Sequence, residues 1–504
     1  MKRSKFSLSN YKLLSCDMGE LVPIGITEVL AGDSVQQSTS ALVRAAPLLS
    51  PVMHPVHVNI HHWFVPHRLI WEDWEDFITG GPDGMDASVF PTITGPGGGG
   101  YAVGSLADYL GIPTGINSLE HSALPFRAYA LIFNEWYRDQ DLVTPLTIDT
   151  SSGPDTTTNT TLQVSAWEKD YFTSARPWEQ KGPAITIPLG TRADVRGIGI
   201  TDATFEASSA NAWNTRETPD ISTAAVVGWR IKDPANATGA GQTYLNIDEG
   251  DTGYPDIYAD LSNASAVTVN VLREALALQR YEEARARYGS RYTEYLRYLG
   301  VSSSDARLQR PEYLGGGKNT IQFSEVLQTA EGSDPVGEMR GHGISATRSN
   351  RFRRFFEEHG YILTFCTVRP KTMYGNGLAR HWNRRSKEDF WQKELQHIGQ
   401  QEVLNKEVYA AHTSPNGVFG YQDRYDEYRR SESTIAGEFR TSTLNFWHLA
   451  RIFSSNPALN SDFVKCIPTE RVFASSSTDV LYIMARHRIQ ARRLVAQTGA
   501  SFIY

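Results

Sequence analysis

Two stretches far apart in the chain carry the apolar pattern of β-strands, and they constrain what this sequence can fold into more than any other feature. In residues 56–64, apolar Val56, Val58 and Ile60 alternate with polar residues, which is the period of a strand with one buried face. Residues 361–368 (YILTFCTV) are apolar on both faces, as is typical of a strand in the middle of a core. Long segments that contain short helices separate these strands. The pattern favours an antiparallel β-sandwich or barrel with elaborated loops over a βαβ alternation.

Aromatic residues at helical spacing predict short helices between the strands. One covers 68–81, where a Gly-Gly pair supplies the stop signal, and another covers 125–137. A longer helix is predicted over 272–299 with a break at Gly289, and a short strand is predicted at 267–271. The aromatic residues expected to hold the core and the subunit contacts are Trp71, Trp74, Phe126, Phe133, Trp136 and Tyr137.

Residues 191–256 differ in composition from the rest of the chain. They are rich in Thr, Ala, Ser, Asn, Gly and Asp, carry 5 basic and 10 acidic residues, and show weak periodicity. Loops longer than ~15 residues inside a compact domain are uncommon and usually functional. We therefore expect residues 1–190 and 257–504 to form one domain together, with 191–256 as an inserted subdomain or an exposed decoration.

The composition excludes several classes of protein. With 40% hydrophobic and 21% charged residues, the chain is not globally disordered. No run approaches the ~18 consecutive apolar residues of a membrane span, and the basic N-terminal segment lacks the apolar stretch of a secretory signal. The three cysteines are widely spaced, which argues against a disulfide framework and a Cys-type zinc site and indicates synthesis in a reducing cytoplasm.

Signatures of catalysis and nucleotide binding are absent or incomplete. The sequence contains no G-x-S-x-G nucleophile motif. The LGGGKNT segment at 314–320 has Glu312 where a phosphate loop needs its first glycine, and Asn319 where that loop needs Ser or Thr to hold magnesium. The GPGGGG segment at 95–100 lacks the strand and helix that flank a dinucleotide site, so we interpret it as a turn. The sequence therefore predicts no catalytic residues and no bound cofactor.

Clusters of histidine and of acidic residues suggest metal or acid–base sites, but a structural role is favoured for each. Five histidines lie within 54–67, and His57 and His61 are four residues apart. On a strand that spacing is roughly 13 Å, too far for one ion, so a polar strand face or a subunit contact is favoured. The four acids of the WEDWED segment at 71–76 are interpreted as first-turn residues that offset the helix dipole. The DEGDTG segment at 248–253 fits no EF-hand spacing, and no metal site is predicted.

Charge is distributed unevenly along the chain. Residues 1–260 contain 16 Lys and Arg against 31 Asp and Glu, whereas 261–504 contain 33 against 25. Basic residues cluster with aromatic ones at 351–356 and at 380–387, and a further basic cluster lies at 486–493. Arginine beside aromatic rings is how proteins hold single-stranded nucleic acid without reading its sequence. Ion pairing between subunits is the alternative interpretation, and the residues alone leave both open.

Several segments spread over most of residues 1–480 resemble the major capsid proteins of microviruses, the small icosahedral phages with single-stranded DNA genomes, and specifically their gokushovirus branch. The segments are FVPHRLIWEDWEDFITGG (64–81), LADYLGIPTG (106–115), LPFRAYALIFNEWYRDQDL (124–142), DYFTSARPWEQKGPAITIPLG (170–190), RYTEYLRYLGVSSSDARLQRPEYLGGGK (291–318), EHGYIL (358–363), VFGYQDRYDEYRR (418–430) and LNFWHLARIF (444–453). Residues 191–256 match nothing in that pattern, at the place where the family carries a variable insertion.

The resemblance implies a mainly β fold, namely an eight-stranded antiparallel jelly roll with long helix-containing loop insertions. It implies a T=1 shell of sixty copies around circular single-stranded DNA, with 191–256 as a surface protrusion at the threefold axis that serves host attachment. The implied partners are further copies of the chain, the genome on the inner face, a small DNA-binding packaging protein, a pilot or minor capsid protein and a host surface receptor. The implied location is the virion, after assembly in the host cell cytoplasm.

On this resemblance, basic residues near both ends of the chain are predicted to contact DNA on the inner surface of the shell. They are Lys2, Arg3, Lys5, Arg486, Arg488, Arg492 and Arg493. Two other functions stay open from the residues alone. One is a carbohydrate-binding or glycan-cleaving β-sandwich, for which the WEDWED acids are the candidate group. The other is a non-viral oligomeric nucleic-acid-binding protein.

Overall fold

The computed structural model describes residues 3–183, 185, 194–196, 215–216, 245–246, 258–260, 269–288, 291–329, 336–475 and 477–497. The chain divides into two compact units. The larger unit consists of Met1–Lys181 together with Glu283–Tyr504, and the smaller one of Gly182–Glu282. The two sheets and the candidate interface considered below belong to the larger unit.

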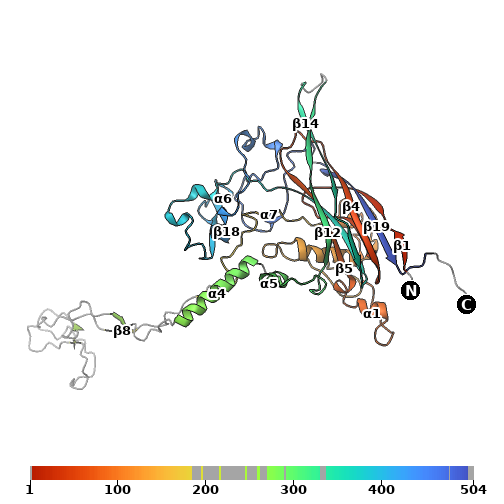
Figure 1. Cartoon of the computed structure of the whole chain (residues 1–504), viewed down its shortest axis with the longest axis horizontal. Helices are drawn as coiled ribbons and strands as arrows, with labels where there is room; N and C mark the ends of the chain where they lie inside the picture. The colour runs from red at the N-terminus through yellow and green to blue at the C-terminus, as the bar shows by residue number, and fades with distance from the viewer. Residues whose placement is uncertain are drawn as a thin grey trace, which may run out of the picture. The chain divides into compact units, whose positions relative to one another are not determined.

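One sheet of the larger unit has seven strands (Figure 1). Its central path runs in the order β1-β19-β4-β14-β13, with β2 paired to β19 and β15 paired to β4. All of these pairings are antiparallel. The strands are β1 (Ser4–Ser7), β2 (Asn10–Cys16), β4 (Ser34–Ala45), β13 (Gln322–Leu327), β14 (Met339–Arg348), β15 (Phe352–Phe355) and β19 (Leu481–Arg493).

A second sheet has four antiparallel strands in the order β12-β5-β16-β3. They are β3 (Val22–Val29), β5 (Val56–Pro66), β12 (Glu312–Thr320) and β16 (Gly360–Pro370). The prediction of a mainly β chain built from antiparallel sheets is therefore confirmed at this level. The two strands predicted from the sequence, at 56–64 and 361–368, are the central strands of this second sheet.

The two sheets pack face to face around one apolar core. Val43 and Ile483 from the seven-stranded sheet join Val58 and Ile60 from the four-stranded sheet in a single cluster of buried residues. All four are inaccessible to solvent. Burial of such aliphatic side chains contributes roughly 1.5–3 kcal/mol each, so this contact is the main source of cohesion between the sheets.

Polar side chains connect the sheets within the same interior. His62 of β5 makes hydrogen bonds of 2.9 Å to the hydroxyl groups of Thr364 and Ser349. The Thr364 hydroxyl also accepts a 3.1 Å bond from Gln37 of the opposite sheet. Burial, with a smaller contribution from the nearby His487, lowers the pKa of His62 to about 3, so His62 is neutral at neutral pH.

His487 of β19 makes a second polar connection between the sheets. Its Nε2 lies 2.9 Å from the carbonyl oxygen of Ile24 in β3, and its Nδ1 lies 2.9 Å from the Thr39 hydroxyl. A carbonyl can only accept, so Nε2 carries the proton and Nδ1 accepts from Thr39. Burial lowers the pKa of His487 as well. Both histidines thus hold the two sheets in register in their neutral forms.

Strand β5 differs from its prediction because both of its faces are covered. The alternation in 56–64 predicts one solvent-facing side, yet Asn59 and Trp63 on that side are buried. The reason is tertiary: helix α3 (Leu124–Ile132) packs on this face. The polar alternation therefore marks positions covered by other parts of the fold, as at His61 and Trp63, which both contact the Tyr137 hydroxyl, and not a solvated surface.

The predicted aromatic helices are present in shorter form and supply a second core. Residues 68–81 contain a 3₁₀ turn, η1 (His67–Leu69), followed by α1 (Trp74–Thr79), and α3 continues into a π-helical turn, η2 (Phe133–Tyr137). All six predicted aromatic residues belong to one cluster. Trp71, Phe126 and Phe133 are buried within it, and Trp74, Trp136 and Tyr137 pack against it half-buried.

The strand predicted at 267–271 is wrong, because helix α4 (Val269–Tyr288) includes Val269 and Val271. The run of Leu, Ala, Glu, Gln and Arg that follows has strong helix propensity, and it extends the helix back over two valines whose own preference is weak. The break predicted at Gly289 agrees with the structure, in which α4 ends at Tyr288 and α5 (Tyr292–Tyr298) follows.

The remaining elements are short and lie in the connecting segments. They are β6 (Thr92–Thr94), α2 (Leu106–Leu110), β7 (Glu120–Ser122), β17 (Gln400–Leu404), α6 (Asn405–Val408), β18 (Val418–Asp423) and α7 (Ser461–Val464) in the larger unit, and β8 (Asp194–Arg196), β9 (Thr215–Arg216), β10 (Leu245–Asn246) and β11 (Tyr258–Asp260) in the smaller. Strand β8 pairs with β11, and β9 with β10. Apart from β8, β9 and β10, the predicted insertion at 191–256 lies outside the described residues.

Truncation of a buried aromatic side chain tests the second core. We expect Trp71→Ala to cost about 3–5 kcal/mol of unfolding free energy, because the indole is fully buried. Trp382→Ala is the matched control, since that side chain is 65% exposed and should change stability by less than about 0.5 kcal/mol. Urea unfolding of the unassembled chain measures both. Equal decreases in stability in the two variants would contradict the assignment of Trp71 to the core.

The buried histidines predict a loss of stability in acid. The pKa of His62 falls from 6.5 to about 3 on folding, so the unfolded chain binds the proton first, and stability decreases as pH falls from 6.5 toward 3. Each pH unit in that window costs about 1.4 kcal/mol per such histidine. The difference between the unfolding free energies at pH 7 and at pH 4.5 should therefore be smaller for His62→Gln than for the parent chain. The control variant His397→Gln, which changes an exposed histidine, should keep the full difference. An unchanged difference in His62→Gln would contradict the assignment.

Candidate nucleic-acid interface

The outer face of the seven-stranded sheet carries the basic residues of β19. Alternate residues of this strand, such as Ile483 and His487, face the core, and those between them face outward. This period of two places Arg486, Arg488 and Arg492 on the same exposed face. The strand therefore presents three arginines in a row along one side.

The register of the sheet brings further basic residues from distant parts of the chain to this face. Lys5 is paired with Arg492, and Arg44 lies on the same side through its pairing with Tyr482. Arg3, just before β1, donates a 3.1 Å hydrogen bond to the outward Ser34 hydroxyl. We call this surface the basic sheet face. Its basic residues are Arg3, Lys5, Arg44, Arg340, Arg348, Arg353, Arg486, Arg488 and Arg492.

The charges of the basic sheet face are largely unneutralised. None of the residues that the strands β1, β2, β4, β13, β14, β15 and β19 direct to this side is Asp or Glu. Arg340 pairs with Glu338 at 2.9 Å where the β13–β14 hairpin ends. No ion pair with a described residue is formed by the others, Arg3, Lys5, Arg44, Arg348, Arg353, Arg486, Arg488 and Arg492. A surface of this kind attracts polyanions.

Two aromatic rings of this face each lie beside an arginine. Tyr11 of β2 is 65% exposed, and the guanidinium carbon of Arg486 lies 5.5 Å from its ring centre. Phe355 of β15 is 48% exposed, with the guanidinium carbon of Arg3 at 5.0 Å. Exposed rings beside arginine are the arrangement on which unpaired bases stack.

Arg493 differs from the other predicted residues. It lies on the opposite side of β19, and its Nε is 3.0 Å from the Asp33 carboxylate in an ion pair too bent for a hydrogen bond. The Asp33 carboxylate is fully buried, so Arg493 is committed to neutralising it. Lys2 lies outside the described residues. The other predicted residues, Arg3, Lys5, Arg486, Arg488 and Arg492, lie on the basic sheet face.

The other basic clusters divide between the two interpretations left open by the sequence. In 351–356, Arg353 belongs to the basic sheet face, whereas Arg354 pairs with Glu312 at 2.9 Å. In 380–387, Arg380 pairs with Glu407 at 2.9 Å, so that cluster is partly neutralised within the chain. The prediction missed Arg44, Arg340 and Arg348. The alternation of buried and exposed positions along β4 and β14 is the signal that could have found them.

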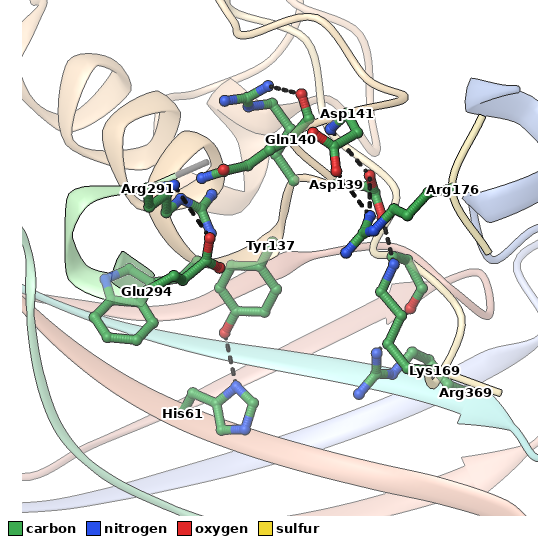
Figure 2. Close-up of a pocket in the computed structure, with 13 residues that line it drawn as sticks. His61, Tyr137, Asp139, Gln140, Asp141, Lys169, Arg176, Arg291, Glu294 and Arg369 are labelled. Carbon is green, nitrogen blue, oxygen red and sulfur yellow. Dashed lines mark hydrogen bonds and ion pairs between the residues drawn. The ribbon is translucent and has the colours of Figure 1, made fainter. Parts of the chain in front are cut away.

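A polar cavity of about 340 Å³ lies elsewhere in the larger unit and is lined by several charged groups (Figure 2). Arg176 Nη1 lies 2.9 Å from the Asp141 carboxylate, and Lys169 pairs with Asp139. Burial alone would raise the pKa of Asp139, but the pairing with Lys169 and Arg176 outweighs it and holds that pKa below its ordinary value. Asp139 is therefore ionised at neutral pH, and both Asp139 and Asp141 already form ion pairs with neighbouring basic side chains.

The same cavity contains a His–Tyr pair without catalytic character. His61 Nδ1 and the Tyr137 hydroxyl are 2.7 Å apart (Figure 2). Burial lowers the pKa of His61 to about 4 and raises that of Tyr137, so both groups are neutral at neutral pH. At neutral pH the pair is therefore a hydrogen bond between two uncharged side chains, with no ionised nucleophile.

The other described residues agree with this. They contain no group of three His, Cys, Asp or Glu side chains arranged to hold a metal ion. The three cysteines are buried, and burial raises the pKa of each thiol. No helix in the part of the chain that the structure describes is long and apolar enough to cross a membrane.

Comparison with known proteins decides the family. A family model described as "Capsid protein (F protein)" matches residues 1–502. The chain belongs to this capsid protein family. It is 37% identical over 495 residues to capsid protein VP1 of Bdellovibrio phage phiMH2K, a match that covers 95% of this chain and 90% of the relative. It is 34% identical to capsid protein VP1 of Chlamydia phage 1, covering 94% and 91% of the two chains, and 31% identical to that of Spiroplasma virus 4, covering 92% and 87%.

Family membership confirms the resemblance inferred from the sequence segments. The chain is a structural capsid protein of the microvirus type and is not an enzyme. Its role is to assemble with copies of itself into the shell of a virion. The glycan-cleaving and non-viral alternatives are therefore excluded, and the basic sheet face must be interpreted within a capsid.

Proposed function

We propose that sixty copies of this chain form a T=1 icosahedral shell around a circular single-stranded DNA genome, with the basic sheet face directed inward. The observation that carries the proposal is the charge of that face, which gathers cations from five strands and has no acidic strand residue among them. Exposed arginines without partners repel one another in the isolated chain. A polyanion packed against them removes that repulsion.

The proposed genome is single-stranded because the face offers stacking surfaces as well as charge. Tyr11 and Phe355 are exposed beside arginines, and a base can stack on either ring only when it is unpaired. Arginine contacts to phosphate carry no sequence information, so the shell would accept any genome sequence. The predicted contacts at Arg3, Lys5, Arg486, Arg488 and Arg492 fit this function, whereas Arg493 fits a structural role.

We propose that the fold is an eight-stranded jelly roll. Four antiparallel strands in the order β2-β19-β4-β14 face four in the order β3-β16-β5-β12. Along the chain, successive strands alternate between the two groups, except that β5 and β12, which follow one another among the eight, both belong to the second group. This connectivity is that of a jelly roll built from two Greek keys. Strands β1, β13 and β15 extend the first sheet beyond the eight.

We further propose that 191–256 forms a surface protrusion at the threefold axis and serves host attachment. The segment has 5 basic and 10 acidic residues, a charge unsuited to the side of a shell that holds a polyanion. A small DNA-binding packaging protein, a pilot or minor capsid protein and a host receptor complete the proposed partners. Assembly in the host cytoplasm suits a chain whose cysteines are unpaired.

Charge removal on β19 tests the proposed genome contact. The variant Arg486→Gln, Arg488→Gln, Arg492→Gln should bind oligodeoxythymidylate more weakly than the parent chain. The log–log slope of affinity against salt should fall by about 0.7 for each phosphate that the variant no longer neutralises. A triple variant at exposed Arg307, Lys387 and Lys393 removes the same charge elsewhere and should leave the slope unchanged. Equal effects from both triple variants would contradict a DNA-binding role for the basic sheet face.

Limited proteolysis of intact particles tests the protrusion. We expect the first cuts to fall within 191–256, because that segment would be the part of the chain farthest from the shell wall. An antibody raised against a peptide from this segment should bind whole particles, and one raised against 481–493 should not. Binding of the second antibody but not the first would mean that the two surfaces are assigned to the wrong sides.

A further inference from the structure

A small pocket interrupts the basic sheet face where β14 ends and β15 begins. Its volume is about 60 Å³. The pocket lies above β4 and β19, whose residues Ser38 and Arg488 are paired across the sheet. Its outward side chains are Gln36, Ser38, Arg348, Arg351, Arg488 and Gln490. Residues more than 450 positions apart in the chain therefore line one pocket.

The polar groups around this pocket lack partners. None of the six side chains makes a hydrogen bond or an ion pair with another described residue. Elsewhere in the larger unit, arginines such as Arg310 and Arg380 are paired with carboxylates. Arg348, Arg351 and Arg488 instead converge on one place with no acid among the lining residues. Three like charges held close together are unfavourable unless an anion lies between them.

The size and the chemistry of the pocket indicate which kind of anion fits it. A volume of about 60 Å³ is several times the ~10–15 Å³ that one water needs, but it is too small for a nucleobase with its sugar. Guanidinium groups present planar pairs of N–H donors that match the oxygens of a phosphate, and the amides of Gln36 and Gln490 and the Ser38 hydroxyl add neutral donors. Strands β4 and β19 hold these donors on a rigid frame.

We propose that this pocket binds one phosphodiester phosphate of the packaged strand as a discrete site. The inference deepens the proposed function and rests on it, since the basic sheet face must first meet the genome. Arg353, paired with Gln36, and Arg486, two residues before Arg488, flank the pocket. The neighbouring phosphates of a strand seated in the pocket can reach these flanking arginines. The pocket thus fixes one point of the strand, and the rest of the face holds it by charge alone.

Single substitutions separate a discrete site from a uniformly charged face. We expect Arg348→Gln and Arg488→Gln each to weaken binding of oligodeoxythymidylate to the purified chain about tenfold, because each removes charge-assisted bonds to one phosphate. The matched controls Arg44→Gln and Arg492→Gln remove the same charge from the same face, away from the pocket and its flanking arginines, and should weaken binding less than about threefold. The double variant Arg348→Gln, Arg488→Gln should weaken binding by less than the product of the single effects, since both residues act on one group.

A second variant and a second ligand complete the test. Ser38→Asp adds a carboxylate inside the pocket and removes no cation, so it should weaken binding at least as much as Arg348→Gln, with thermal unfolding measured to verify that the chain is folded. Equal and additive effects at Arg44, Arg348, Arg488 and Arg492 would overturn the discrete site and leave the DNA-binding face intact. Unchanged binding in all four variants would overturn both. Tight binding of inorganic phosphate that the oligonucleotide cannot displace would show a free-phosphate site and overturn the genome contact.

Discussion

The packing of one antiparallel sheet against another is the constraint on which the rest of this structure depends. Each sheet has two faces, and the aliphatic core between them uses one face of each. The neutral side chains of His62 and His487 add hydrogen bonds that cross the same interface. The outer face of the four-stranded sheet is then covered by α3 and the aromatic cluster around it. The described residues leave the outer face of the seven-stranded sheet exposed, so its side chains are available for function.

The open face acquires its charge through strand geometry. Since neighbouring residues of a strand point to opposite sides, every second position of β19 must be apolar to fit the core, and the positions between can be basic. Arg493 falls on the wrong side of this alternation and is paired with Asp33. The contrast between Arg492 and Arg493 shows how a single step along a strand changes a residue from a candidate DNA contact into a structural one.

A capsid protein of this kind assembles with copies of itself and has no catalytic role. The polar cavity near Tyr137 fits that description, because its carboxylates are neutralised from within and its His–Tyr pair is neutral. The basic sheet face instead brings together eight basic residues that form no ion pair with a described residue. A protein gains nothing in stability from unneutralised like charges, so their presence on one face is best explained by an anionic partner in the assembled particle.

The sequence by itself determined the strand character of 56–64 and 361–368, the aromatic helices, the absence of catalytic motifs and the family, because these depend on local periodicity or on segments read in order. It also contained the alternation that directs Arg486, Arg488 and Arg492 to one side. Only the tertiary structure decided which distant strands add further basic residues to the same side of the sheet. The pairing of β4 with β14 and β19 brings Arg348 beside Arg488, and the packing of α3 buries the second face of β5. Cross-strand register and sheet stacking bring together residues that are hundreds of positions apart in the chain, and no local sequence pattern predicts which of them will meet.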